Sequence, residues 1–188
     1  FFFKQKTAYE IYQCDWSSDV CSSDLDSGAE DYVTSSLKST DSVNLATGVF
    51  GTYDVLSKLE AKSEDVLRDV ITKKIRKIPH IRATYTMIAD DKNSFSKKIE
   101  GKDILDTYLS QAYILLECEK GKELDTVNNL KSIAEVIDGD VLFTSHQVIC
   151  NVMAPTYNEI SDVVTKKIRK LPGIKGTTTL NVINHRPK

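Results

Sequence analysis

The sequence has few of the residues that mark specialised protein classes: its 188 residues include one tryptophan, three histidines, four cysteines and four prolines. No apolar run approaches the roughly 18 residues of a membrane-spanning helix, and the opening Phe1-Phe2-Phe3-Lys4 lacks the charged-then-apolar order of a signal peptide. The 25 Lys+Arg nearly balance the 27 Asp+Glu, so no overall charge attracts nucleic acid or an anionic membrane. We expect neither membrane insertion, secretion nor direct nucleic-acid binding by this chain.

Residues 1–25 differ in character from the rest of the chain. They read FFFKQKTAYEIYQCDWSSDVCSSDL, which resembles the in-frame translation of a sequencing-library adapter, with KQKTAYEI and DWSSDVCSSDL as its two constant blocks. We interpret this segment as an adapter-derived artefact of cloning or assembly. The alternative is a genuine Ser/Asp-rich disordered N-terminus.

Two cysteines lie outside the adapter-like segment, Cys118 and Cys150. Both occur in apolar alternating stretches, and neither has CxxC spacing or a nearby histidine partner. Such cysteines behave as small buried hydrophobic residues, so we expect reduced thiols and a cytoplasmic location.

An internal repeat organises the chain after residue 25. The letters TKKIRK at residues 72–77 recur at residues 165–170, a shift of 93 positions. The same ungapped shift places Phe50 on Phe143 and also aligns many other residues along both halves. We interpret the chain as a tandem pair of related domains.

The second copy predicts the element order βαββαβ. Its patterns are an aliphatic strand at 112–118, an amphipathic helix from residue 123, a hairpin over 141–152, a capped helix from Thr156 with the apolar stripe Ile160, Val163, Val164, Ile168 and Leu171, and a β-branched strand at 177–183. The fold class is therefore α+β, with two ferredoxin-like βαββαβ domains of the dimeric α/β-barrel type.

The expected domain boundaries follow from the repeat. Residues 26–89 form a truncated first domain, 90–110 a polar linker with a short helix, and 111–184 the second domain. The first copy lacks its opening strand in this interpretation, because strand 112–118 maps into the adapter-like segment. Helices cover one face of each sheet only, so we expect the two helix-free faces to pair within the chain.

Two sequence phrases carry a resemblance to a known family. The hairpin phrase TGVFGTYDVL at 47–56 and the run KIRKLPGIKGTTT at 167–179, together with the βαββαβ order, resemble the effector-binding (RAM) domain of the Lrp/AsnC regulators. The resemblance covers nearly all of residues 26–184, twice. It implies sheet-mediated pairing, larger oligomers, and binding of amino acids or related effectors near the hairpin. In that family a separate N-terminal helix-turn-helix domain binds DNA, and no such domain is visible in this sequence.

An amino-acid site needs an anion near the ammonium group and donors near the carboxylate. Asp54 could supply the anion, Gly51 a close backbone approach, and threonine hydroxyls the donors. The candidate effector-binding residues are Gly51, Tyr53, Asp54, Thr84, Thr86, His146, Gln147, Thr177 and Thr179. The alternative is a plain tight hairpin beside threonine-rich strands. In the second copy Gln147 replaces Asp54, so that site is either lost or altered in specificity.

Two other patterns have structural explanations. The clusters Lys73–Lys77 and Lys166–Lys170 could contact phosphate, but cations at helix ends also complement the helix dipole. The three histidines share no metal-ligand spacing. We expect no metal and no cofactor.

These observations favour an effector-binding and oligomerisation module of an Lrp/AsnC-type transcriptional regulator that is not an enzyme. Its partners would be an amino acid or related effector, further copies of itself, or other Lrp-like regulators. One alternative is a ligand-free assembly module that pairs with full-length regulators. Another is a cofactor-dependent enzyme of the dimeric α/β-barrel class, with His146 as its candidate haem ligand.

Overall fold

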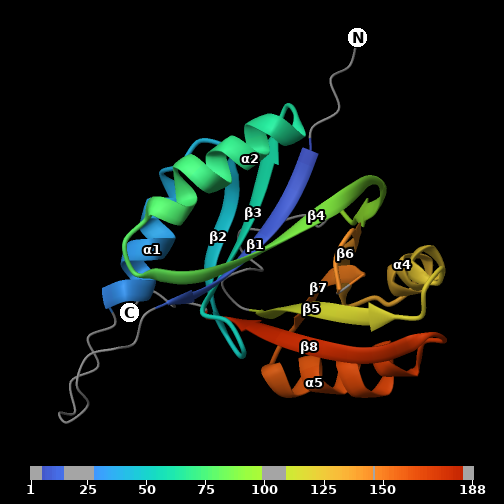
Figure 1. The fold of residues 1–188 in the computed structure, drawn as a ribbon. Coiled ribbons are helices and arrows are strands. Elements are labelled where there is room, and N and C mark those ends of the chain that lie inside the picture. Colours follow the sequence, from blue (N-terminus) through green and yellow to red (C-terminus); the bar gives the residue numbers. More distant parts are fainter. Residues whose placement is uncertain (1–5, 15–27, 99–108, 146, 184–188) are drawn as a thin grey trace. The chain divides into compact units, whose positions relative to one another are not determined.

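The computed structural model describes residues 6–14, 28–98, 109–145 and 147–183. The chain divides into two compact units. The first contains residues 1–49 and 53–87, and the second contains residues 50–52 and 88–188. Figure 1 shows the elements of both units.

The first unit has the order βαββαβ. Its elements are β1 (Lys6–Cys14), α1 (Gly28–Lys38), β2 (Val43–Phe50), β3 (Val55–Ala61), α2 (Glu64–Lys73), a 3-10 helix (Ile75–Lys77) and the first part of β4 (Ile81–Ser96). Strand β3 pairs antiparallel with both β1 and β2. The fold class is α+β, as predicted, with antiparallel pairing.

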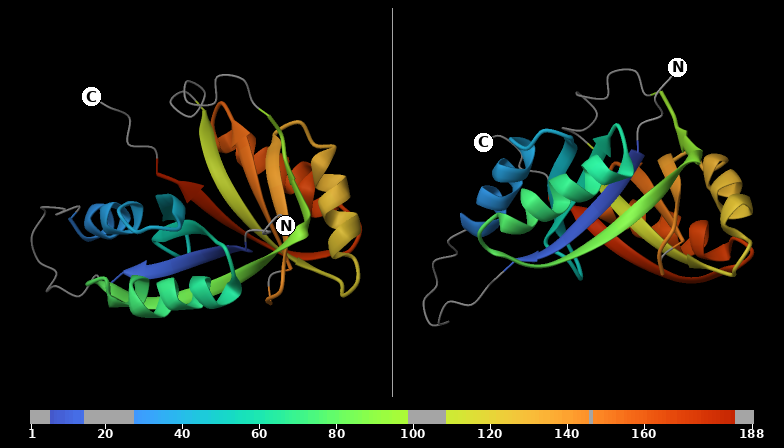
Figure 2. Two further views of the ribbon diagram at one scale, coloured as in Figure 1. Left: turned by 90° about the horizontal axis from the view of Figure 1, so that it is seen from above. Right: turned by 45° about the horizontal axis from the view of Figure 1, so that its top comes forward.

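The second unit has the same order of elements. They are β5 (Ser110–Cys118), α4 (Glu123–Lys131), β6 (Val136–Leu142), β7 (Val148–Ala154), α5 (Tyr157–Lys166), a 3-10 helix (Ile168–Lys170) and β8 (Ile174–Val182). Strand β5 pairs with β7 and β8, and β6 pairs with β7 and with the second part of β4. Figure 2 shows α4 and α5 against these strands in two further views.

Each unit has its own core between its helices and one face of its sheet. The predicted stripe of α5 is buried, and Ile160, Val163 and Val164 pack against β5 and β7. The equivalent residues Leu67, Val70 and Ile71 of α2 do the same in the first unit. Helix α5 begins as predicted, because the Thr156 hydroxyl accepts a hydrogen bond from the Glu159 N–H at 3.3 Å.

The first unit does have an opening strand, which corrects the sequence-based expectation. Residues 6–14, inside the adapter-like segment, form β1 and pair with β3 from Lys6↔Ala61 to Tyr12↔Val55. Ala8 and Tyr12 alternate toward the helices and are buried in the core. An alternating segment rich in strand-forming residues can occupy a strand position whatever its origin, because the pairing bonds are made by main-chain groups that every residue except proline carries.

Residues 90–96 also differ from expectation, since they form a strand where we expected a linker. In this stretch Ser94, Phe95 and Ser96 pair with β6, and Phe95 packs against the core of the second unit. The polar composition that indicated a linker is also typical of an edge strand with one solvated side. The short helix expected at Ile104, Leu105 and Tyr108 lies outside the described residues.

Two further expectations concern the membrane and the thiols. In the described part of the chain, no helix is long and apolar enough to cross a membrane. Cys118 and Cys150 are free and buried, as predicted. Burial raises the pKa of both thiols, which keeps them protonated and unreactive.

Candidate functional site

The predicted hairpin residues are held by main-chain bonds. The Asp54 N–H donates to the carbonyl of Tyr12 at 2.9 Å, and the Asp54 carbonyl accepts from Val49 at 2.8 Å. Tyr53 and Asp54 are half-buried. Gly51, with φ 152°, lies in the second unit, and a Cβ there would be 2.9 Å from the carbonyl oxygen of Thr179. The close approach that we predicted for Gly51 is therefore to β8 backbone.

The predicted threonine donors contact protein groups on the helix side of each sheet. Arg76 Nε donates to Thr84 Oγ1 at 3.1 Å, and Arg169 Nε donates to Thr177 Oγ1 at 2.7 Å. Thr86 donates to the buried carboxylate of Glu10. Of the four predicted threonines, Thr84 and Thr86 lie in the first unit, and Thr177 and Thr179 lie in the second.

The second-copy hairpin has one described candidate. His146 lies outside the described residues. The Gln147 side chain accepts the N–H of Cys118 at 2.7 Å and donates to the carbonyl of Ser145. Gln147 therefore ties the hairpin to the end of β5, which is a structural role.

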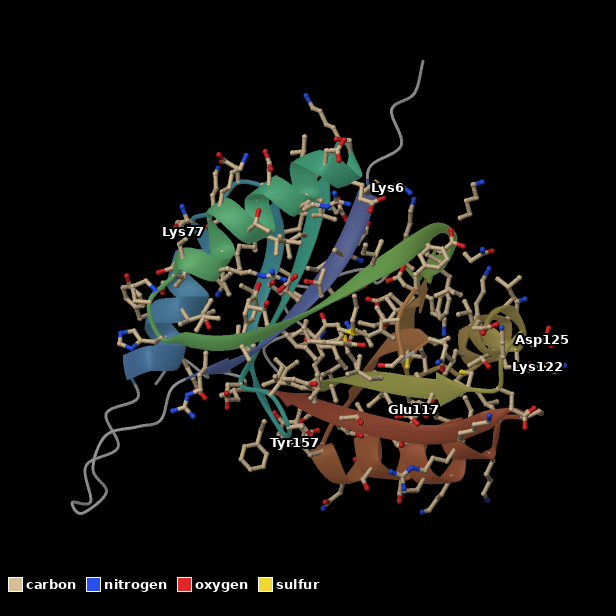
Figure 3. The ribbon with its side chains drawn as sticks, viewed as in Figure 1. Lys6, Lys77, Glu117, Lys122, Asp125 and Tyr157 are labelled. Carbon is tan, nitrogen blue, oxygen red and sulfur yellow. The ribbon has the colours of Figure 1, made fainter. Side chains whose placement is uncertain are left out.

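The basic clusters at the helix ends carry mostly internal contacts. Lys73 pairs with Asp69 at 2.7 Å, and Lys166 pairs with Asp162 at 2.8 Å, each one helical turn away. Lys77, labelled in Figure 3, is exposed beyond the end of α2. These contacts support the structural explanation over a phosphate site.

A row of polar side chains crosses the helix-free face of the second unit. Gln111 Nε2 of β5 donates to Asn151 Oδ1 of β7 at 3.0 Å, and Asn151 Nδ2 donates to Asp138 Oδ2 of β6 at 3.3 Å. Asp140 projects to the same face two residues along β6. Asn151 is 1% exposed and Asp140 is 7% exposed. We call Gln111, Asn151, Asp138 and Asp140 the polar row.

The surroundings of the polar row are apolar. Leu115 pairs with Ile149 and Tyr113 with Asn151 on this face, and both apolar partners of the first pair are buried. Burial is costly for carboxylate and amide groups unless they are hydrogen-bonded. Asp138 also raises the pKa of Cys150, after the larger effect of burial. The polar row is thus a hydrogen-bonded group of charged and amide side chains on an otherwise apolar sheet face.

The first unit does not repeat the polar row. Under the 93-residue shift, Lys58 stands where the second unit has Asn151, and Leu45 stands where it has Asp138. Lys58 Nζ lies 5.2 Å above the ring of Tyr9, a cation–π contact on the corresponding face. The two helix-free faces have therefore diverged in charge.

The sequence analysis missed this row, although a signal was present. Strand β6 reads VIDGDVL, where two aspartates interrupt an apolar run, and β7 carries an asparagine among apolar residues. Polar residues at alternate positions of an apolar strand indicate one shared sheet face. Only the strand register shows that all three strands contribute to the same row.

Comparisons with known proteins give matches among solved structures only. No family model matches the chain. No curated protein matches it either. The siroheme decarboxylase NirDL matches 96% of this chain and 72% of its own, at 8% identity and a TM-score of 0.64. A putative monooxygenase from Lactobacillus acidophilus and an anthrone oxidase-like protein also match over most of both chains.

The chain also matches two further solved structures over shorter stretches. FFRP-DM1 matches 39% of this chain and 99% of its own, at 31% identity and a TM-score of 0.38. E. coli AsnC matches 67% of this chain and 76% of its own, at 16% identity and a TM-score of 0.41. The solved structures that resemble the chain thus include AsnC and a siroheme decarboxylase.

These matches correct one expectation. We expected a protein that is not an enzyme, and this is contradicted because the solved structures that match nearly the whole chain include enzymes. At 8% and 7% identity they show the fold alone. The fold is therefore one that carries enzymes.

Proposed function

We propose that the second unit binds a small ligand with an ammonium group, an amino acid or a related molecule, at the polar row on its helix-free sheet face. The chain would then act as an effector-binding and self-associating module related to Lrp/AsnC regulators. The observation that carries this proposal is the hydrogen-bonded chain Gln111–Asn151–Asp138 on an apolar face.

The chemistry of the row suits such a ligand. An ammonium group has three donors, and the oxygens of Asp138 and Asp140 are acceptors on neighbouring positions of one strand face. The Asn151 amide is fixed by contacts on both sides, which orients the acceptors before binding. Charge-assisted bonds gain strength where the surroundings exclude water.

The hairpin site of the first unit remains a separate proposal. Asp54 would hold an ammonium group there, and Asp54→Asn would then weaken binding. The ligand-free assembly module is the alternative to both sites. It predicts that no amino acid stabilises the parent chain, and none stabilises the Asp54→Asn or Asp138→Asn variant.

Isothermal titration calorimetry with the twenty amino acids tests the polar-row proposal. We expect at least one to bind, and Asp138→Asn to raise its Kd at least tenfold because a charged acceptor is lost. The matched control is Asp125→Asn, since Asp125 is an exposed carboxylate of α4 that pairs with Lys122, the N-cap residue of that helix (Figure 3). Equal binding by Asp138→Asn and the parent chain would contradict the proposal.

The same samples test self-association and catalysis. Sedimentation velocity should show a species larger than one chain, because the large apolar side chains of Phe50 and Phe143 are exposed on the single chain. A monomer at every concentration would contradict the self-associating role. Mass spectrometry of a bound amino acid after incubation separates an effector, which stays intact, from a substrate, which is converted.

A further inference from the structure

The second unit contains a cavity on its helix side that is separate from the polar row. Its volume is about 400 Å³, within the range of small-molecule sites. The end of β7, helix α5, Leu109 and Glu135 line it. Its wall is apolar at Leu109, Ala154 and Val163, and its rim carries Glu135, Lys166 and Lys167 among its charged groups.

Glu135 is the most unusual group at this cavity. Its Oε1 accepts a hydrogen bond from Lys167 Nζ at 2.6 Å. Its Oε2 is shielded from solvent and has no hydrogen-bond partner in the described part of the chain. The bond to Lys167 lowers the pKa of Glu135, so the carboxylate stays ionised at neutral pH. A buried anionic oxygen without a donor is costly, and a bound donor would remove that cost.

We propose that this cavity binds a primary ammonium group carried on an apolar body, with the ammonium at Glu135 and the body against Leu109 and Val163. The terminal torsion of a glutamate is soft, so the carboxylate can turn its second oxygen toward the cavity. An amine and an amino acid share this chemistry. Lys166 pairs with Asp162 and Lys167 with Glu135 in the ligand-free chain. Either lysine that turned from its partner to the ligand would favour an amino acid, whose carboxylate a simple amine lacks.

The first unit repeats the lysines at the helix end but does not repeat the carboxylate of the cavity. Lys166 and Lys167 correspond to Lys73 and Lys74 under the 93-residue shift, and Lys74 pairs with Asp41 at 3.7 Å. The apolar wall is shared in part, since Val70 stands where the second unit has Val163. The carboxylate has no such counterpart, because Ser42 stands where the second unit has Glu135. The carboxylate that would select an ammonium group therefore occurs at this position in the second unit alone.

The experiment uses 3-methylbutylamine and L-leucine, two probes that differ only in the carboxylate. Titration calorimetry on the full chain should give saturable binding of at least one, with a Kd at least tenfold higher in Glu135→Gln. Tighter binding of L-leucine would show that the cavity prefers an amino acid. Tighter binding of 3-methylbutylamine would show that it prefers a simple amine. Lys74→Met in the first unit is the matched control and should leave the Kd unchanged.

Asp138→Asn distinguishes this site from the polar row. Binding at the cavity should persist in that variant, whereas loss of binding in Asp138→Asn with full binding in Glu135→Gln would place the ligand at the polar row and overturn the cavity proposal. Absence of saturable binding by both probes would overturn it as well. Circular dichroism of each variant confirms that the comparison is made on folded protein.

Discussion

Glu10 of β1 accepts a hydrogen bond from the hydroxyl group of Thr86 in the core of the first unit. Lys6 pairs with Ala61 as Ser110 pairs with Ala154, so Glu10 occupies the position that Ile114 has in the second unit. Glu10 is fully buried, and its Oε2 has no hydrogen-bond partner in the described part of the chain. Burial is the main cause that raises its pKa to about 7.

The raised pKa of Glu10 predicts that the first unit loses stability as the pH rises. The unfolded carboxyl loses its proton near its ordinary pKa of 4.5, whereas the folded one keeps it to about 7. Between these values the folded state binds more protons, so the free energy of unfolding falls with pH. The shift corresponds to a loss of about 3 kcal/mol.

Urea unfolding of the parent chain and Glu10→Gln at pH 5 and pH 8 measures this effect. The difference in stability between the two pH values should be smaller by about 2.5 kcal/mol in Glu10→Gln, because part of the loss occurs below pH 5. Glu10→Ile, which installs the residue of the second unit, should stabilise the first unit at both pH values. An unchanged pH difference in Glu10→Gln would show that Glu10 is not buried.

Gly51 and Gly121 provide a test of the hairpin contact. Both have positive φ, but a Cβ on Gly51 would lie 2.9 Å from the Thr179 carbonyl, whereas a Cβ on Gly121 would meet nothing within 4 Å. Gly121→Ala should therefore lower the free energy of unfolding by about 1 kcal/mol through backbone strain alone. Gly51→Ala should lower it further, because its Cβ also meets the Thr179 carbonyl. Thermal unfolding compares them. Equal losses would contradict the close approach to β8.

The Arg76–Thr84 and Arg169–Thr177 contacts should stabilise their units by similar amounts. Each arginine bond joins a 3-10 helix to the following strand, at 3.1 Å and 2.7 Å. We expect Thr84→Val and Thr177→Val each to cost about 1 kcal/mol in urea unfolding, because the arginines are exposed and can return to water. A cost near zero in both would show that the hydroxyls are not bonded.

The buried thiols should resist modification in the native state. In a Cys14→Ser, Cys21→Ser background, Cys118 and Cys150 should react with Ellman's reagent only after denaturation, because burial keeps both thiols protonated and inaccessible. The absorbance of the thionitrobenzoate released at pH 8, with and without guanidinium, measures how many of the two thiols react. Fast reaction of Cys150 in native protein would contradict its burial.

Local patterns predicted the elements of this fold well. The apolar stripe around Val163 predicted helix α5, and Thr156 predicted where that helix begins. Alternating apolar residues predicted the paired strands of the hairpin. Strand β1 was missed because the resemblance of residues 1–25 to an adapter argued against any structural role. The strand position is fixed by main-chain pairing, and an adapter-like segment with alternating Ala8, Glu10 and Tyr12 satisfies it, at the cost of burying Glu10.

The candidate site was much less predictable. Thr84 and Thr177 looked like free donors, but each accepts an arginine bond eight residues from the donor, a contact that depends on the 3-10 turn. The polar row requires the register of β5, β6 and β7, which places Asp138 opposite Asn151 across a bulge. Register of this kind follows from packing, and spacing along the sequence does not reveal it.

The central claim is that the polar row of the second unit binds an ammonium-bearing ligand. Two-dimensional NMR of the side-chain amides tests it directly, because Gln111 and Asn151 are the amide members of the row. On titration with the amino acid that binds most tightly, those two amide signals should shift and saturate in the parent chain and stay unshifted in Asp138→Asn. Saturable binding that leaves both amide signals unmoved in the parent chain would contradict the account.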